Sequence, residues 1–188
     1  MGSMSAQSID KLRQFPLFRG CGPDELERLD ACVSPRSMPT AGEVLFGQGV
    51  DSDAAYIVKS GLLIAELVLD DGQSVEMARM GAGAIVGELC LIKGGPRSLR
   101  VRCSEPTQLL RIDRDRFELL RSNNDSAAYA VIRNICYTMC DRLRTTNEFI
   151  ESELRHEAPM QAAEARAKKA GVVERARTYL SSLFGKGS

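Results

Sequence analysis

The middle of the chain alternates between short apolar runs and single glycines. Six segments between Ser37 and Asp113 are rich in β-branched or aliphatic residues: 44–46, 55–58, 62–69, 75–80, 99–103 and 108–112. The glycines between them recur at roughly the 8–12-residue spacing that is typical of an all-β sandwich or barrel, and Asp71-Gly72 is a strong hairpin turn. This pattern predicts an antiparallel roll.

Helical signals flank the predicted roll on both sides. Before it, Pro23 opens a helix whose first turn is acidic, which the helix dipole favours, so residues 8–29 predict a helical cap. After it, a short helix begins near Asp113, and Asp125 or Ser126 is a good N-cap for a long helix that ends near residue 155. The predicted fold class is therefore α+β, a jelly-roll-like antiparallel β-roll with helices at both ends.

The segment from Gly87 to Val101 collects groups that suit an anion. A tight turn frees backbone N–H groups, while Arg97 and Ser98 add a guanidinium and a hydroxyl, and together these suit a single phosphate. A phosphate would repel Glu88 unless that carboxylate binds a neighbouring sugar hydroxyl while Arg97 offsets the charge. The set indicates a ribose phosphate. The alternative is a surface salt bridge between Glu88 and Arg97, worth about 0 to 1 kcal/mol.

This segment resembles the phosphate-binding cassette of the cyclic nucleotide-binding domain family, of the catabolite activator and protein kinase A regulatory subunit type. The order Gly-Glu-Leu, a small residue, Leu and then Pro-Arg-Ser is close to the family pattern. The run from Ala41 to Phe46 and the positions up to Gly61 are similar to the family's first strands. The resemblance implies one such domain over residues 8–155, with a short helix inside the cassette.

The resemblance also implies roles for individual residues. Arg97 and the backbone around Gly87 and Leu89 would hold the cyclic phosphate, Glu88 the ribose 2′-hydroxyl and Ser98 a phosphate oxygen. Family members use the long helix as a lid over the base, which sets two of its polar residues against the purine, although a polar pair on a helix is also commonly just solvated. The complete predicted ligand-binding set is Gly87, Glu88, Leu89, Cys90, Arg97, Ser98, Thr146 and Asn147.

Cys90 occupies the small position beside the phosphate, where the family often has alanine or glycine. Ser98 does not separate cAMP from cGMP, because a serine after the arginine occurs with either nucleotide in the family. The long helix of bacterial style favours cAMP. The cyclic mononucleotide is the expected ligand, and no cofactor or metal is expected.

The long helix carries two apolar stripes, one with Ile132, Ile135 and Met139 and the other with Cys136, Cys140 and Leu143. The second stripe predicts contact with a twin helix in a homodimer through residues 126–155, or with a moving element. A single wide core face in a monomer is the alternative. Residues 156–188 predict a basic amphipathic helix that docks on a protein partner, lies on an anionic membrane surface or folds back on its own domain.

Composition narrows the classes of function. Twenty-five basic residues balance twenty-five acidic ones, so nothing indicates a nucleic-acid coat. Too few residues follow the long helix for a winged helix-turn-helix, so no specific DNA binding is expected. His156 is the sole histidine and no nucleophile–base set emerges, which argues against an enzyme.

The termini and cysteines indicate the compartment. The chain has neither a run of roughly 18 apolar residues nor a signal-peptide pattern, and residues 1–7 look like a tag, so a cytoplasmic location is expected. We expect the six cysteines to be free and mostly buried. The sequence thus favours a cyclic nucleotide sensor, with a scaffold that binds no nucleotide or a truncated transcription regulator as alternatives.

Overall fold

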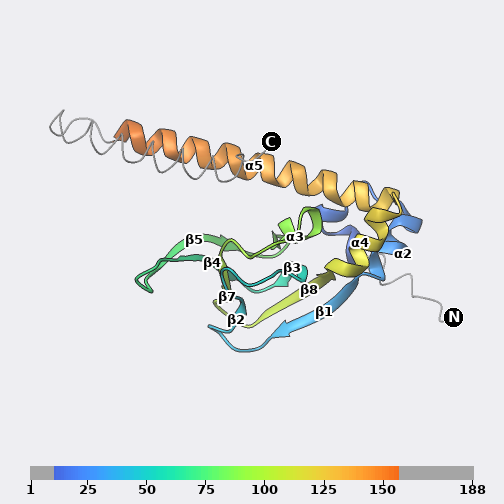
Figure 1. Ribbon diagram of the computed structural model, residues 1–188, viewed down its shortest axis with the longest axis horizontal. Coiled ribbons are helices and arrows are strands. Elements are labelled where there is room, and N and C mark those ends of the chain that lie inside the picture. Colours follow the sequence, from blue (N-terminus) through green and yellow to red (C-terminus); the bar gives the residue numbers. More distant parts are fainter. Residues whose placement is uncertain (1–10, 157–188) are drawn as a thin grey trace. The chain divides into compact units, whose positions relative to one another are not determined.

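The computed structural model describes residues 11–156, which form two four-stranded antiparallel sheets and a set of helices (Figure 1). One sheet has the strand order β1-β8-β3-β6 and the other has the order β2-β7-β4-β5. The strands are β1 (Val33–Met38), β2 (Val44–Phe46), β3 (Ala54–Ser60), β4 (Leu63–Val68), β5 (Ser74–Met80), β6 (Ile85–Val86), β7 (Arg100–Cys103) and β8 (Thr107–Asp113). The helical elements are η1 (Pro16–Phe18), α2 (Pro23–Asp30), α3 (Leu89–Ile92), α4 (Arg114–Ser122) and α5 (Ser126–His156). The predicted α+β roll is confirmed.

Strand β3 is apolar over five consecutive residues because both of its faces are covered. Ala55 and Ile57 point into a core shared with the helices, while Tyr56 and Val58 point into the core between the two sheets. A strand that is buried on both faces does not alternate between polar and apolar residues. The uninterrupted run in the sequence is therefore the mark of the central strand.

Two strands were not predicted. Strand β1 is largely exposed and contains Pro35, yet it pairs along its whole length with β8. It lies at the edge of its sheet, where a proline is tolerated because one side of the strand needs no hydrogen-bonded neighbour. Strand β6 has only two residues, too few to show a period of two. Its Ile85 and Val86 pair with β3 and lead directly into the cassette.

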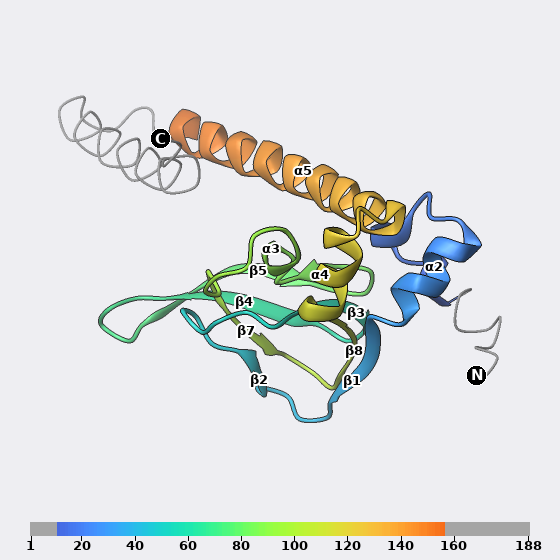
Figure 2. The same cartoon turned by 45° about the vertical axis from the view of Figure 1, so that its right-hand side comes forward.

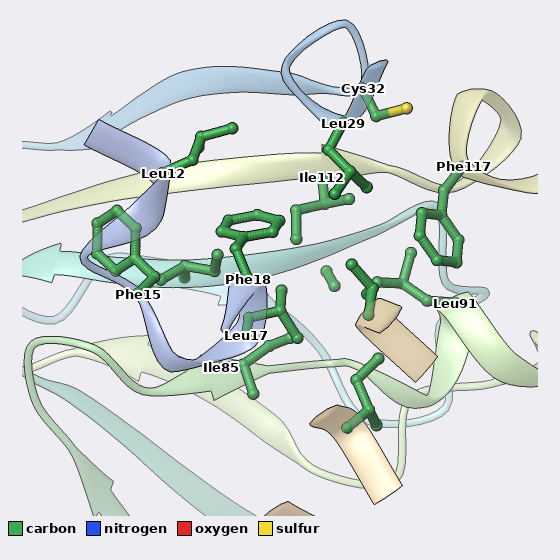
Figure 3. Packing of buried hydrophobic residues seen from close by; sticks show 14 of the residues in the cluster. Leu12, Phe15, Leu17, Phe18, Leu29, Cys32, Ile85, Leu91, Ile112 and Phe117 are labelled. Carbon is green, nitrogen blue, oxygen red and sulfur yellow. The ribbon is translucent and has the colours of Figure 1, made fainter. Parts of the chain in front are cut away.

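The helical core joins the N-terminal cap to the roll (Figure 3). The side chains of Phe18, Leu26 and Leu29 are almost fully buried, and they pack in one cluster with Ile112 of β8 and Phe117 of α4. Full burial of each such side chain contributes roughly 1.5–3 kcal/mol. Leu91 of α3 belongs to the same cluster, so the cassette helix is packed into the main core.

Helix α5 begins in the unit formed by residues 1–137 and continues into a second unit from Thr138 onward. In the first unit its buried side includes Val131 and Ile135. Asn134 is buried as well, and its Nδ2 donates hydrogen bonds to the carbonyl oxygens of Leu17 (2.8 Å) and Arg19 (2.9 Å). These bonds fix the loop before α2 to the start of α5.

Several sequence predictions fall on residues outside the described range. These are the tag over residues 1–7 and the amphipathic helix predicted after residue 156. Among residues 11–156, no helix is both long and apolar enough to cross a membrane.

Asp113 is the last residue of β8, and its carboxylate caps the N-terminus of α4, the helix that follows β8 in Figure 2. Its Oδ1 accepts a hydrogen bond from the backbone N–H of Arg116 (3.0 Å), and its Oδ2 pairs with Nη1 of Arg111 (2.7 Å). Replacing Asp113 with alanine removes both contacts, and we expect the free energy of unfolding to fall by about 1–2 kcal/mol at pH 7. Urea unfolding of the two proteins measures the difference.

The pH dependence of that difference has a definite sign. The hydrogen bond from Arg111 lowers the pKa of Asp113 below its ordinary value of 3.8, with help from the backbone of Arg116. The stabilisation is therefore complete well above pH 3.8 and is lost as the pH falls through the lowered pKa. Asp115 lies two residues further on, in the first turn of α4, is exposed and serves as the control, with an expected change within about 0.5 kcal/mol on mutation to alanine. A difference for Asp113 that persists unchanged at pH 2 contradicts the ionic origin.

Candidate functional site: a guanidinium buried against a glycine turn

The site begins where β6 ends and the chain turns sharply at Gly87. This glycine has a φ of +69°, in the left-handed region that side chains rarely adopt. The turn directs the chain into the single turn of α3, in which the backbone N–H groups of Cys90 and Leu91 donate to the carbonyls of Gly87 (3.3 Å) and Glu88 (3.0 Å). The earlier N–H groups of a helix have no acceptor within it. The start of α3 is therefore the part of the cassette whose geometry suits an anion.

The side chain of Arg97 turns into the protein and is 4% exposed. Its Nη2 donates to the carbonyl oxygen of Ala54 (2.6 Å) and lies 3.5 Å from Oδ1 of Asp53, while Nη1 donates to the carbonyl oxygen of Gly87 (3.3 Å). The backbone of the same residue is held by the loop before β3, since its N–H donates to the carbonyl of Val50 (2.8 Å). Strands far apart in the sequence thus position one cation beside the glycine turn.

This buried cation is only partly compensated. Within the part of the chain that the structure describes, Nε of Arg97 has no hydrogen-bond acceptor. The carboxylate of Asp53, which lies 3.5 Å from Nη2, has a side chain 71% exposed and also pairs with Arg111 (3.0 Å). A buried charge that lacks full pairing is costly unless a ligand supplies the missing acceptor. The arrangement suits a compact anion.

Glu88 lies at the start of α3 and is buried, as is Arg97, and each residue is 6% exposed. The alternative of a surface salt bridge beside a glycine-rich turn is therefore wrong, because neither group is on the surface. Of the other residues predicted for the cassette, Cys90 is buried next to Arg97, whereas Leu89 and Ser98 are exposed.

The sequence matches the profile of the cyclic nucleotide-binding domain over residues 40–124, which includes the whole cassette. Residues 40–124 of the chain therefore form a cyclic nucleotide-binding domain. The Cyclic AMP receptor protein of Thermus thermophilus is 32% identical over 104 residues, which are 55% of this chain and 48% of that protein. The chain spans 17% to 24% of the length of the first curated relatives that it matches.

Solved structures agree with this assignment. The Catabolite Activator Protein of Thermus thermophilus superposes with a TM-score of 0.60 at 29% identity, over 72% of this chain and 62% of that chain. The regulatory domain of Toxoplasma gondii PKA, crystallised with cAMP, superposes with a TM-score of 0.55 at 26% identity, over 62% of this chain and 46% of that one. The predicted family is confirmed.

Two residues predicted for the site of this cyclic nucleotide-binding domain lie in the second unit. Thr146 and Asn147 are on α5 beyond Thr138. The hydroxyl of Thr146 donates to the carbonyl oxygen of Arg142 (2.9 Å) on its own helix, as threonines in helices commonly do. Contact between these two residues and a purine remains a prediction.

Sequence reasoning missed two partners of the Arg97 guanidinium, namely Asp53 and Ala54. Although burial acts to raise it, the hydrogen bond from Arg111 and the nearby positive charges lower the pKa of Asp53, so this carboxylate is ionised at neutral pH. Ala54 contributes only a backbone carbonyl, which no sequence pattern reveals. Asp53 could have been found from the sequence, because it is an acidic residue directly before an apolar strand and lies within the region that resembles the family's first strands. Among residues 11–156 no three His, Cys, Asp or Glu side chains gather as a metal site.

The cysteines divide into buried and exposed groups. All six are free; Cys32, Cys90 and Cys103 are buried, Cys21 is half-buried, and Cys136 and Cys140 are exposed. The expectation of free and mostly buried cysteines therefore holds for the four outside α5, whereas the two on α5 are exposed. Burial raises the pKa of the Cys90 thiol to about 11, although the guanidinium of Arg97 acts in the opposite direction. With that pKa the thiol of Cys90 is neutral at pH 7.

Alkylation rates test this division. With iodoacetamide at pH 8, we expect rapid modification of Cys136 and Cys140 and slow modification of Cys90, because the reactive species is the thiolate. Mass spectrometry of digests at timed points measures each site, and replacing both helix cysteines with serine removes the fast phase. Modification of Cys90 in the folded protein as fast as Cys136 contradicts the prediction.

Proposed function

We propose that this protein is a non-catalytic sensor of a purine cyclic mononucleotide and that it prefers cAMP to cGMP. One observation carries the proposal: Arg97 is buried beside the turn at Gly87 with its Nε lacking an acceptor among the described residues. A monoanionic cyclic phosphate supplies that acceptor and one compensating charge. The preference for cAMP is supported by two of the relatives, a Cyclic AMP receptor protein and a kinase regulatory domain crystallised with cAMP.

In this proposal each part of the cassette has one task. The guanidinium of Arg97 and the backbone around Gly87 and Leu89 bind the phosphate, with Ser98 on a phosphate oxygen. Glu88, which is buried, accepts a hydrogen bond from the ribose 2′-hydroxyl. Thr146 and Asn147 of α5 bind the purine edge. The proposed site thus combines a charge contact, which gives affinity, with hydroxyl and base contacts, which give selectivity.

Signalling follows from a shift between pre-existing arrangements of the long helix. The nucleotide binds more tightly when α5 closes over the base, so it raises the population of that arrangement. A shift from 1:99 to 99:1 requires a preference of about 5.5 kcal/mol. The C-terminal helices then regulate a protein partner, and the exposed cysteine side of α5 is available for a homodimer.

Calorimetric titration with cAMP, cGMP and cyclic di-GMP tests the proposal. We expect saturable binding of cAMP, weaker binding of cGMP and no binding of the dinucleotide. The absence of heat with all three at millimolar concentration identifies a scaffold of the same fold that binds no nucleotide. Binding of cyclic di-GMP alone contradicts the assignment of the pocket.

A further inference from the structure

An aromatic pair lies against the buried guanidinium. Cζ of Arg97 is 4.1 Å from the ring centroid of Phe46, at the end of β2. The Phe46 ring in turn stacks on Tyr56 of β3, with ring centroids 6.1 Å apart and planes inclined by 29°. Since β2 and β3 belong to different sheets, the three side chains form a stack that crosses between the sheets.

The stack matters because of the shape of the guanidinium. Its five N–H donors point outward in the plane of the group, while its two faces have no hydrogen-bonding capacity. The face of an aromatic ring attracts a cation within about 6 Å, and more strongly when water is excluded. With the Arg97 side chain 4% exposed, the contact with Phe46 is desolvated. The ring satisfies one face and leaves the edge of the guanidinium for hydrogen bonds.

The N–H donors along the edge of the guanidinium have two kinds of acceptor within reach. Inward, it meets the carbonyl oxygens of Ala54 and Gly87 at the cassette. Outward, it meets Asp53, whose side chain is 71% exposed and only 3.5 Å from Nη2. A carboxylate attracts the guanidinium more strongly than a neutral carbonyl does. Nη2 nevertheless lies closer to the carbonyl oxygen of Ala54 (2.6 Å) than to Oδ1 of Asp53 (3.5 Å), and the ring of Phe46 is the group in contact with the guanidinium face.

We infer that Phe46 is a positioning residue of the nucleotide site, which holds the guanidinium of Arg97 at the cassette with Nε directed to the bound phosphate. The expected effect of Phe46 on nucleotide affinity rests on the proposed function. The contact between Phe46 and Arg97 does not depend on that proposal. Phe46 acts through Arg97 and need not touch the nucleotide.

Three variants test whether the aromatic face of Phe46, and not only its apolar volume, is needed to position Arg97. Phe46→Leu keeps an apolar side chain without the aromatic face, Phe46→Tyr keeps the face, and Val44→Ala alters an exposed residue of the same strand. In calorimetric titrations with cAMP we expect Phe46→Leu to bind about 5- to 30-fold more weakly, as the range for a desolvated cation–π contact implies. Phe46→Tyr and Val44→Ala are expected within about threefold of the unmodified protein. Equal affinity for Phe46→Leu and the unmodified protein overturns the inference.

A ligand-free measurement keeps the two hypotheses apart. Urea unfolding of the unmodified protein, Phe46→Leu, Arg97→Gln and the double variant forms a double-mutant cycle. Non-additive changes, with the double variant less destabilised than the sum of the single ones, support the contact, and additive changes overturn it. If the unmodified protein binds no cyclic nucleotide, the proposed function fails. The cycle still decides whether Phe46 stabilises the buried guanidinium of Arg97.

Discussion

Replacing Arg97 with glutamine is expected to weaken binding of cAMP by roughly 100- to 1,000-fold, because the phosphate then lies in a buried site without its cation. The arginine side chain is 4% exposed, so water does not replace the lost charge as it would at the surface. Calorimetric titration of the two proteins under the same buffer measures the loss. Arg97→Lys is expected to fall between them, since an ammonium keeps the charge but loses the planar fork of donors.

Two controls make this result specific. Arg36→Gln removes the same charge from the exposed strand β1, and the affinity is expected to stay within about threefold. Circular dichroism and urea unfolding of Arg97→Gln establish whether the variant still folds. A folded Arg97→Gln protein that binds cAMP as tightly as the original would remove the basis of the proposed site.

Replacing Gly87 with alanine is expected to damage the site without removing the charge of Arg97. A Cβ at this position would overlap Nη1 of Arg97, and the φ of +69° costs roughly 1–2 kcal/mol for a residue with a side chain. The guanidinium must move away from the cassette to make room. We expect cAMP affinity to fall by at least about tenfold in calorimetric titration, together with a lower free energy of unfolding.

Gly95 offers a matched control in the same cassette. Its φ is +99°, but a Cβ there would meet nothing within 4 Å. Gly95→Ala should therefore show the backbone cost, again roughly 1–2 kcal/mol in urea unfolding, with cAMP affinity within about threefold. If both alanine variants lose affinity equally, strain in the loop accounts for the effect, and the contact between Gly87 and Arg97 does not.

Local signals predicted most of the architecture. Glycines mark turns because they adopt backbone conformations that other residues avoid, so their spacing indicated the antiparallel roll before any contact was known. The cassette could also be read directly, because Gly87 and Arg97 stand only ten residues apart within one short motif. The exposed strand β1 escaped prediction, since an edge strand needs neither apolar alternation nor freedom from proline.

What surrounds the arginine could not be predicted in the same way. Its bond to the carbonyl of Ala54 joins residues 43 positions apart, and its ring contact comes from a strand of the other sheet. Such contacts depend on which strands pair and in which register, and one residue of slip would turn each side chain to the opposite face. The sequence alone determined that the chain forms a roll and that Gly87 and Arg97 belong to one short cassette. Only the tertiary structure decided that Phe46 and Asp53 flank its cation, because pairing between distant strands sets those distances.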